Sequence, residues 1–222
     1  GKMASLGILS SGVAHEINNP LGVILGYAGY LEKKLDAEDP NHRYISEIKR
    51  ESKRCKKIVQ DLLNYARTPQ PEFREEDLND LLDQITDFAA NHTDLRRVEI
   101  IRDFDPELPP VEVDGDQIRQ VAINLILNAG AAMPDGGTLT ISTGVEEERA
   151  VISFSDTGCG IPAEEQEQVF EPFFTTKERG TGLGLAITRQ IIEQHQGLIS
   201  IASEPKQGTA ISIELPFVHE VI

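Results

Sequence analysis

The strongest constraint on the fold of this chain is a helical apolar repeat that fills its first 68 residues and then stops. From Ile45 to Ala66 the steps alternate between three and four, through Ile45, Ile48, Ser52, Cys55, Val59, Leu62 and Ala66. This pattern places one seam along a helix, in the geometry of nearly antiparallel helix packing. An earlier apolar stripe from Leu6 to Leu35 also steps by three or four, and Asp36 to Asn41 interrupts it. We therefore predict a hairpin of two long helices.

One such hairpin cannot bury all of its apolar surface. Ile58, Leu63 and Tyr65 lie outside the seam and widen the apolar face. A symmetric dimer, in which two hairpins form a four-helix bundle, buries this surface. We therefore expect residues 1–68 to be a dimerisation domain and the chain to be a homodimer.

Beyond Thr68-Pro69-Gln70-Pro71, which we interpret as a linker, the periodicity changes. Alternating or β-branched segments predict strands, and helical spacing predicts further helices. The expected strands are 98–101, 138–145, 150–155, 198–202 and 209–215, and the expected helices are 80–90, 117–133 and 185–195. This mixture predicts a two-layer α/β sandwich over residues 69–222.

Composition excludes several classes of function. A formal net charge of −16 argues against broad nucleic-acid binding, because phosphates would be repelled. The chain has no run of about 18 apolar residues and no signal-peptide pattern at its start, so we expect no membrane contact by this segment. Cys55 and Cys159 fall in different predicted domains, which argues against a disulfide framework and fits a cytoplasmic protein.

His15 opens the segment His-Glu-Ile-Asn-Asn-Pro on the first predicted helix. It lies two residues from apolar stripe positions on either side, about 200° around the helix, so it faces away from the core. An exposed neutral imidazole can act as a nucleophile. Glu16 can take its proton, Asn19 lies one turn away, and Pro20 should bend the helix. For an isolated histidine, a solvated helix face would be the simpler interpretation.

Asn124 and Asn128 lie one helical turn apart at the edge of an apolar stripe. Amide carbonyl oxygens at such a position suit a hard cation. The alternative is that both asparagines serve as helix caps or buried hydrogen-bonding groups.

Asp156 ends an alternating strand and is followed by Gly158 and Gly160. A carboxylate only accepts hydrogen bonds, so it can take the exocyclic amine of adenine and reject the carbonyl of guanine. The glycines would let the backbone approach the base closely.

Gly180, Gly182 and Gly184 precede a predicted helix. A glycine-rich backbone leading into a helix N-terminus presents N–H groups to phosphates. Lys177 can add a positive charge there. No strand leads directly into this segment, so the spacing does not indicate a dinucleotide-binding fold.

In this order, these four motifs resemble the catalytic core of two-component sensor histidine kinases, over nearly the whole chain. The resemblance implies a gyrase-type ATP-binding domain at 69–222 that uses ATP and Mg²⁺, with Gln166 to Thr181 as a mobile lid. It implies that phosphoryl groups pass from His15 to an aspartate of a response regulator receiver domain. Glu16 would assist proton removal, and Asn19 would orient water in a phosphatase reaction on that regulator. The further implied positions are Asn128 as main Mg²⁺ ligand with Asn124 in support, Thr181 and Leu183 in the phosphate-binding segment, and Thr209 in the adenine pocket.

Three other functions share parts of this pattern. Hydrolases of the same fold place a glutamate four residues before the metal asparagine, where this chain has Asn124, with Gln120 one turn further back. Neither amide can be a general base, which favours phosphoryl transfer over water attack. A serine kinase would not need the dimeric hairpin, and a non-catalytic dimeric scaffold would not need the motifs.

A basic run on the second predicted helix leaves two interpretations open. It is either a solvated helix face screened by nearby acids, or a surface that steers an acidic response regulator. Its members are Lys49, Arg50, Lys53, Arg54, Lys56 and Lys57.

Overall fold

The computed structural model describes residues 2–36, 38–66, 69–89, 95–177 and 180–219, with the backbone alone for residues 2–15, 64 and 66. The chain forms two compact units. The first contains Gly1–Thr68 together with Thr175–Leu183, and the second contains Pro69–Phe174 and Gly184–Ile222. We call them the hairpin unit and the sheet unit.

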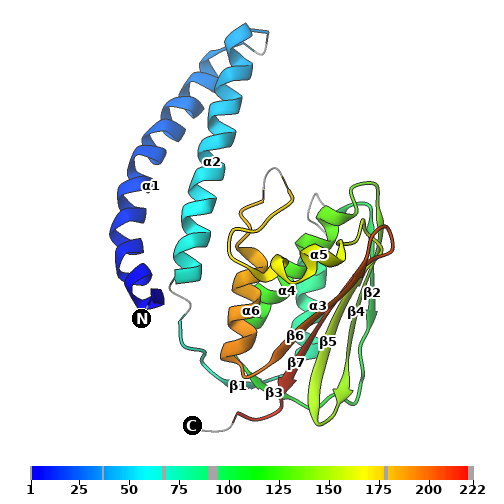
Figure 1. The fold of residues 1–222 in the computed structure, drawn as a ribbon. Coiled ribbons are helices and arrows are strands. Elements are labelled where there is room, and N and C mark those ends of the chain that lie inside the picture. The colour runs from blue at the N-terminus through cyan, green and yellow to red at the C-terminus, as the bar shows by residue number, and fades with distance from the viewer. Residues whose placement is uncertain (1, 37, 67–68, 90–94, 178–179, 220–222) are drawn as a thin grey trace. The chain divides into compact units, whose positions relative to one another are not determined.

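The hairpin unit is built on two long helices that run side by side in opposite directions, α1 (Lys2–Lys34) and α2 (Pro40–Ala66) (Figure 1). Helix α1 continues through Pro20. Helix α2 starts where the sequence provides two start signals, since Asp39 accepts the N–H of Asn41 at 2.8 Å and proline occupies the first helical position.

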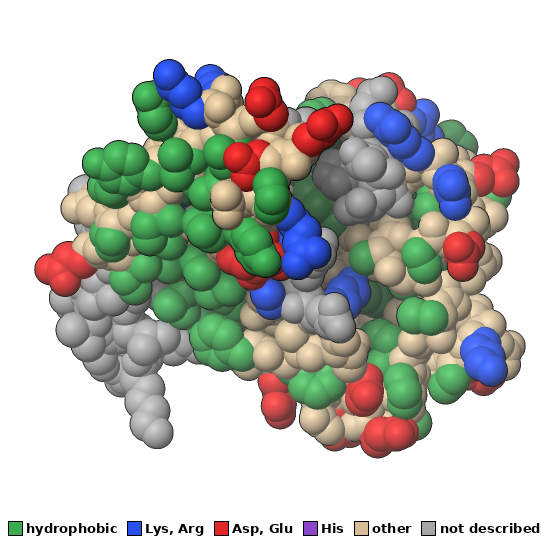
Figure 2. Space-filling model, turned by 90° about the horizontal axis from the view of Figure 1, so that it is seen from above, with side chains coloured by type: hydrophobic (Ala, Val, Ile, Leu, Met, Phe, Trp, Pro, Cys, Tyr) green, Lys and Arg blue, Asp and Glu red, His purple; other side chains and the backbone are tan. Residues whose placement is uncertain are grey.

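The seam between the two helices is only partly buried within one chain. Helices α1 and α2 contact each other, and Ala28, Ser52 and Val59 are buried. Large apolar side chains remain exposed on both helices, among them Val23 (58%), Tyr27 (69%), Tyr30 (60%), Tyr44 (56%) and Ile48 (46%). Figure 2 shows hydrophobic side chains gathered over the hairpin. A continuous apolar surface of this kind marks an interaction site.

The sheet unit is built on a five-stranded sheet with the strand order β2-β4-β5-β7-β6. Strands β2 and β4 are parallel and the other neighbours are antiparallel. The strands are β2 (Val98–Asp103), β4 (Gly137–Glu146), β5 (Arg149–Asp156), β6 (Leu198–Glu204) and β7 (Gly208–Pro216). Along β4, β5 and β7 buried residues alternate with more exposed ones, so one face of the sheet carries the core.

Three helices cover that face: α3 (Leu78–Ala89), α4 (Gly115–Ala132) and α6 (Gly184–Gln194) (Figure 1). A short helix α5 (Ala163–Gln166) and a 3₁₀ turn η2 (Gln168–Phe170) follow the sheet's central hairpin. A small two-stranded sheet pairs β1 (Arg74–Glu76) with β3 (Val111–Val113).

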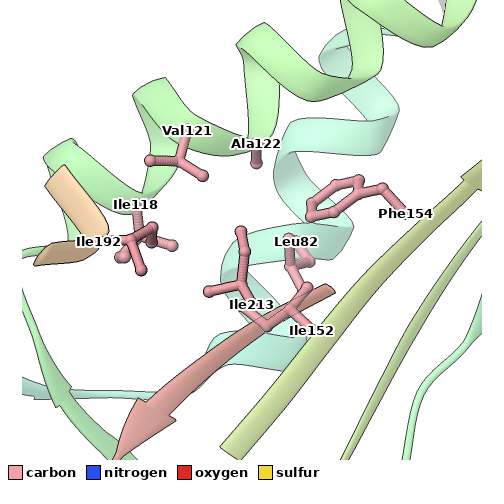
Figure 3. A pocket seen from close by; sticks show the side chains of 8 residues that line it. All are labelled: Leu82, Ile118, Val121, Ala122, Ile152, Phe154, Ile192 and Ile213. Carbon is pink, nitrogen blue, oxygen red and sulfur yellow. The ribbon is translucent and has the colours of Figure 1, made fainter. Parts of the chain in front are cut away.

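The centre of the sheet unit is purely apolar. Eight side chains from α3, α4, α6, β5 and β7 point toward one another there (Figure 3). They are Leu82, Ile118, Val121, Ala122, Ile152, Phe154, Ile192 and Ile213. Fully burying one leucine or isoleucine contributes about 1.5–3 kcal/mol, so this cluster fixes the helices to the sheet.

The predicted fold class is confirmed: a helical hairpin precedes an α/β sandwich. All the helices and strands expected between residues 80 and 215 are present. The pair β1 and β3 was not predicted, because three-residue strands carry too little alternation to be recognised. Within the described part of the chain, no helix combines the length and apolarity needed to cross a membrane.

Candidate functional site

Helix α4 carries both predicted asparagines, and Asp114 determines where it begins. The Asp114 carboxylate accepts the N–H groups of Asp116 and Gln117, each at 3.1 Å, which is a helix N-cap. Its second oxygen accepts the N–H of Glu72 at 3.0 Å. The Asp114 side chain therefore fixes the start of α4 and attaches the backbone at Glu72 to it.

Asn124 and Asn128 are both half-buried on α4. The Asn124 amide nitrogen donates to the carbonyl of Gly184, the first residue of α6, at 3.3 Å. A side chain at Gly184 would begin 3.8 Å from the Asn124 carbonyl oxygen. Because its nitrogen is engaged by the backbone, Asn124 is oriented with its carbonyl oxygen available as an acceptor.

Asp156 belongs to a row of facing residues at one end of the sheet. Leu139 in β4 pairs with Asp156 in β5, Asp156 pairs with Thr209 in β7, and Thr209 pairs with Ser203 in β6. Asp156 has the same parity as Ile152 and Phe154, so it projects from the helix-covered face. The structure therefore places the predicted Asp156 and Thr209 directly across from each other.

The glycines around Asp156 are explained by close backbone approaches. A side-chain carbon on Gly160, at φ +69°, would lie 2.0 Å from the carbonyl oxygen of Glu204. One on Gly158 would lie 2.8 Å from Ala132 at the end of α4, and one on Gly208 would lie 1.9 Å from the carbonyl oxygen of Asp156. These contacts bring the loop after Asp156 against α4 and the β6–β7 turn, and only glycine fits all three positions.

The glycine-rich segment is divided between the two units. Gly184 begins α6 in the sheet unit, whereas Lys177, Gly180, Thr181, Gly182 and Leu183 group with the hairpin unit. Gly182 has φ +67° and Leu183 is fully buried. Predicted residues 178–179 of the lid lie outside the described residues.

The Thr181 hydroxyl makes two hydrogen bonds within the hairpin unit. It donates to Asp61 of α2 at 3.1 Å and accepts the N–H of Leu183 at 3.4 Å. Burial raises the pKa of Asp61 above its ordinary value, and the bond from Thr181 acts in the opposite direction.

His15 lies on α1, and its side chain is outside the described residues. Glu16 and Asn19, on the same helix, are both exposed. The hairpin unit therefore offers a polar helix face at this motif.

The basic run on α2 is partly paired with nearby acids. Lys49 pairs with Glu32 of α1, and this contact lowers the pKa of Glu32. Arg50 pairs with Glu47 at 2.9 Å and with Glu51 at 3.1 Å. Screening by neighbouring acids thus applies to part of the run.

Two family models match the chain. One, "His Kinase A (phospho-acceptor) domain", matches residues 5–71. The other, "Histidine kinase-, DNA gyrase B-, and HSP90-like ATPase", matches residues 113–219. Among solved structures, the catalytic domain of histidine kinase ThkA is 35% identical, with a TM-score of 0.60, over 66% of this chain and 96% of that one. The chain belongs to the two-component histidine kinase family.

Longer kinases resemble both units together. The histidine-protein kinase AtoS of Escherichia coli (strain K12) is 37% identical over 97% of this chain, which spans only 35% of AtoS. A structure of ThkA in complex with the response regulator protein TrrA is 32% identical, with a TM-score of 0.71, over 98% of this chain and 63% of that one. This chain therefore corresponds to a part of such longer kinases.

Sequence reasoning missed several residues that support the site of this histidine kinase. Asp114 carried a recognisable signal, since an aspartate before a helical pattern predicts an N-cap. His195 is fully buried and accepts the N–H of Asp114 at 3.0 Å, but no local pattern distinguishes it from a surface histidine. Ser203 binds the loop after Asp156, and only the strand register brings it there. Gln166, which was expected only as the first residue of the lid, also binds this loop.

Proposed function

We propose that this chain is the catalytic core of a histidine kinase that uses ATP to phosphorylate His15 and passes the phosphoryl group to an aspartate of a response regulator. The observation that carries this proposal is the pairing of Asp156 with Thr209 at the sheet end, where the loop after Asp156 packs on the helix of Asn124 and Asn128. The His-Glu-Ile-Asn-Asn-Pro motif lies on a separate helical unit. We take residues 1–68 as the phosphotransfer domain and 69–222 as the ATP-binding domain.

ATP would bind with its adenine at Asp156 and its phosphates toward the glycine-rich segment that leads into α6. The half-buried amides of Asn128 and Asn124 fit Mg²⁺, because carbonyl oxygens are hard ligands. The bond from the Asn124 nitrogen to Gly184 supports that assignment, since it leaves the carbonyl oxygen as the ligand atom. When bound, Mg²⁺ neutralises charge on the transferred phosphoryl group.

The protein residues then perform the transfer. A lone pair on an imidazole nitrogen of His15 attacks the γ-phosphorus, the bond to the bridging β,γ-oxygen breaks, and ADP leaves with that electron pair. Glu16 accepts the proton that the other ring nitrogen loses, so the product is a neutral imidazole ring that carries the anionic phosphoryl group. In the second step an aspartate oxygen of the regulator attacks phosphorus, and the imidazole nitrogen leaves with the bonding pair while the other ring nitrogen regains its proton from Glu16.

The same helix face can also support removal of the phosphoryl group from the regulator. Asn19 is exposed one turn from His15, where its amide can orient a water that hydrolyses the regulator's phosphoaspartate. The exposed faces of α1 and α2 provide the surfaces for a second copy and for the regulator. Both cysteines are exposed and unpaired, which fits a reducing cytoplasm.

Simple ATP hydrolysis is the competing function. It would require a general base beside the metal asparagines, and the corresponding positions are Gln120 and Asn124. Asn124 is an amide already bonded to Gly184, so nothing at this position removes a proton from water.

Labelling with γ-labelled ATP tests the proposal. The protein should acquire a label that is released in acid and retained in alkali, as a phosphoramidate is. Release of free phosphate without labelled protein would instead establish an ATPase.

A further inference from the structure

Ser203 occupies the end of the row that contains Asp156 and Thr209. Its hydroxyl makes three contacts. It accepts the N–H of Ile161 at 2.8 Å, donates to the carbonyl of Gly208 at 2.9 Å, and lies 2.9 Å from the Thr209 hydroxyl. The sequence offered no indication of this role.

The number of available protons fixes the direction of the third contact. A serine hydroxyl has one proton, and the Gly208 carbonyl can only accept it. The bond between Ser203 and Thr209 must therefore use the proton of Thr209. As a result, the Thr209 oxygen has only lone pairs left for any further partner.

Ser203 is itself held firmly in this arrangement. The side-chain amide of Gln166 donates to the carbonyl of Ser203 at 2.8 Å and to that of Ile161 at 3.0 Å. Both backbone groups of Ile161 are thus bonded, one to each of these side chains. Because Gly160 also lies against Glu204, the loop after Asp156 cannot move away from β6 without breaking these bonds.

We propose that Ser203 is a positioning residue for base specificity, which it exerts by keeping the Thr209 hydroxyl an acceptor. This inference rests on the proposed ATP site. Asp156 lies across from Thr209, and an ionised carboxylate also only accepts. Asp156 and Thr209 therefore both present acceptors to the 6-position of a purine bound at this end of the sheet. The 6-amino group of adenine supplies donors there, whereas the 6-carbonyl of hypoxanthine or guanine would face acceptors without a donor.

The test is titration calorimetry of the 222-residue chain with ADP and with inosine diphosphate, in the presence of Mg²⁺. In Ser203→Ala the Thr209 hydroxyl loses its acceptor at position 203, so it can donate a hydrogen bond to the 6-carbonyl instead. The ratio of ADP affinity to inosine diphosphate affinity should fall about five- to tenfold. Ser203→Thr keeps a hydroxyl and should keep the ratio. Adding Thr209→Val to Ser203→Ala should remove the gain in affinity for inosine diphosphate, because no hydroxyl remains at position 209.

Two further variants make each outcome decisive. If circular dichroism shows that Ser203→Ala is unfolded, Ser203→Cys keeps the side-chain shape with a weak donor and should lower the ratio in the same direction. A wild-type ratio in the folded variant overturns the role of Ser203. Asp156→Asn separates this failure from that of the ATP site: wild-type ADP affinity there refutes the adenine site itself.

Discussion

The two units of this kinase differ in how completely each buries its own apolar surface. In the sheet unit Leu82, Ile126 and Ile152 are at most 1% exposed, and the core closes within one chain. In the hairpin unit Val23, Tyr27 and Ile48 are 46% to 69% exposed. The nucleotide-binding residues we propose are thus built on a self-sufficient fold, whereas the proposed phosphoacceptor motif lies on a helix pair with a large exposed apolar surface, which we propose a second copy covers.

The sharpest test of this division is His15→Gln. We expect it to abolish acid-labile labelling, because the attacking nitrogen is gone, and to leave ADP affinity within about twofold of wild type. His42→Gln, a histidine on α2, is the matched control and should be labelled normally. Wild-type labelling of His15→Gln would assign the phosphoacceptor elsewhere.

Disrupting the exposed apolar surface of the hairpin unit should separate the two copies of the dimer without damaging the nucleotide site of the sheet unit. Ile48→Glu would place a carboxylate in an interface between apolar faces, at a cost of roughly 3–5 kcal/mol per buried unpaired charge. Light scattering should then report a monomer, with ADP still bound. Leu198→Glu alters an apolar residue of the sheet unit that is 57% exposed, against 46% for Ile48, and that variant should remain dimeric. A wild-type protein that is monomeric at micromolar concentration would refute the four-helix bundle.

Asn19→Ala should separate two activities on one helix face. Asn19 is exposed, so its loss should change the melting temperature little and keep labelling within about threefold. Decay of the phosphorylated regulator should slow by about tenfold or more, because water loses the amide that orients it. A parallel fall of labelling, phosphatase activity and melting temperature would instead mean that Asn19 supports the helix before Pro20.

The same contrast explains what could be predicted from sequence. The 3-4 steps of the hairpin and the alternation of β4, β5 and β7 are local patterns, so their elements were predicted within a few residues. Asp156 and Thr209 were each identified singly, yet their pairing depends on strand register. Pro69 accepts a hydrogen bond from Gln117 at 3.2 Å and groups with the sheet unit, a contact across 48 residues that composition could not indicate.

The smallest expected effect concerns His195, a buried titratable group of the sheet unit. Its Nε2 accepts the N–H of Asp114, so the proton must lie on Nδ1, which donates to Ile191 at 2.8 Å. Burial lowers the pKa of His195, and the bond to Ile191 opposes that shift only in part. Two aromatic rings of the described residues lie beside the His195 ring, Phe73 at 5.2 Å and His219 at 6.1 Å between centroids.

The sign of the pH dependence follows from this lowered pKa. The unfolded chain binds a proton near the ordinary histidine value of about 6.5, and the folded chain resists it. The free energy of unfolding should therefore be highest above about pH 7. It should fall as the pH drops from about 6.5 toward the pKa of His195 in the folded chain.

His195→Gln cannot titrate at this position. Its free energy of unfolding should be lower by about 1–3 kcal/mol at pH 7, because the hydrogen bonds are altered, and should change less between pH 7 and 5.5. Urea denaturation at each pH measures both quantities, and His42→Gln in the hairpin unit should retain the wild-type slope. An unchanged slope in His195→Gln would show that other groups cause the acid sensitivity of the sheet unit.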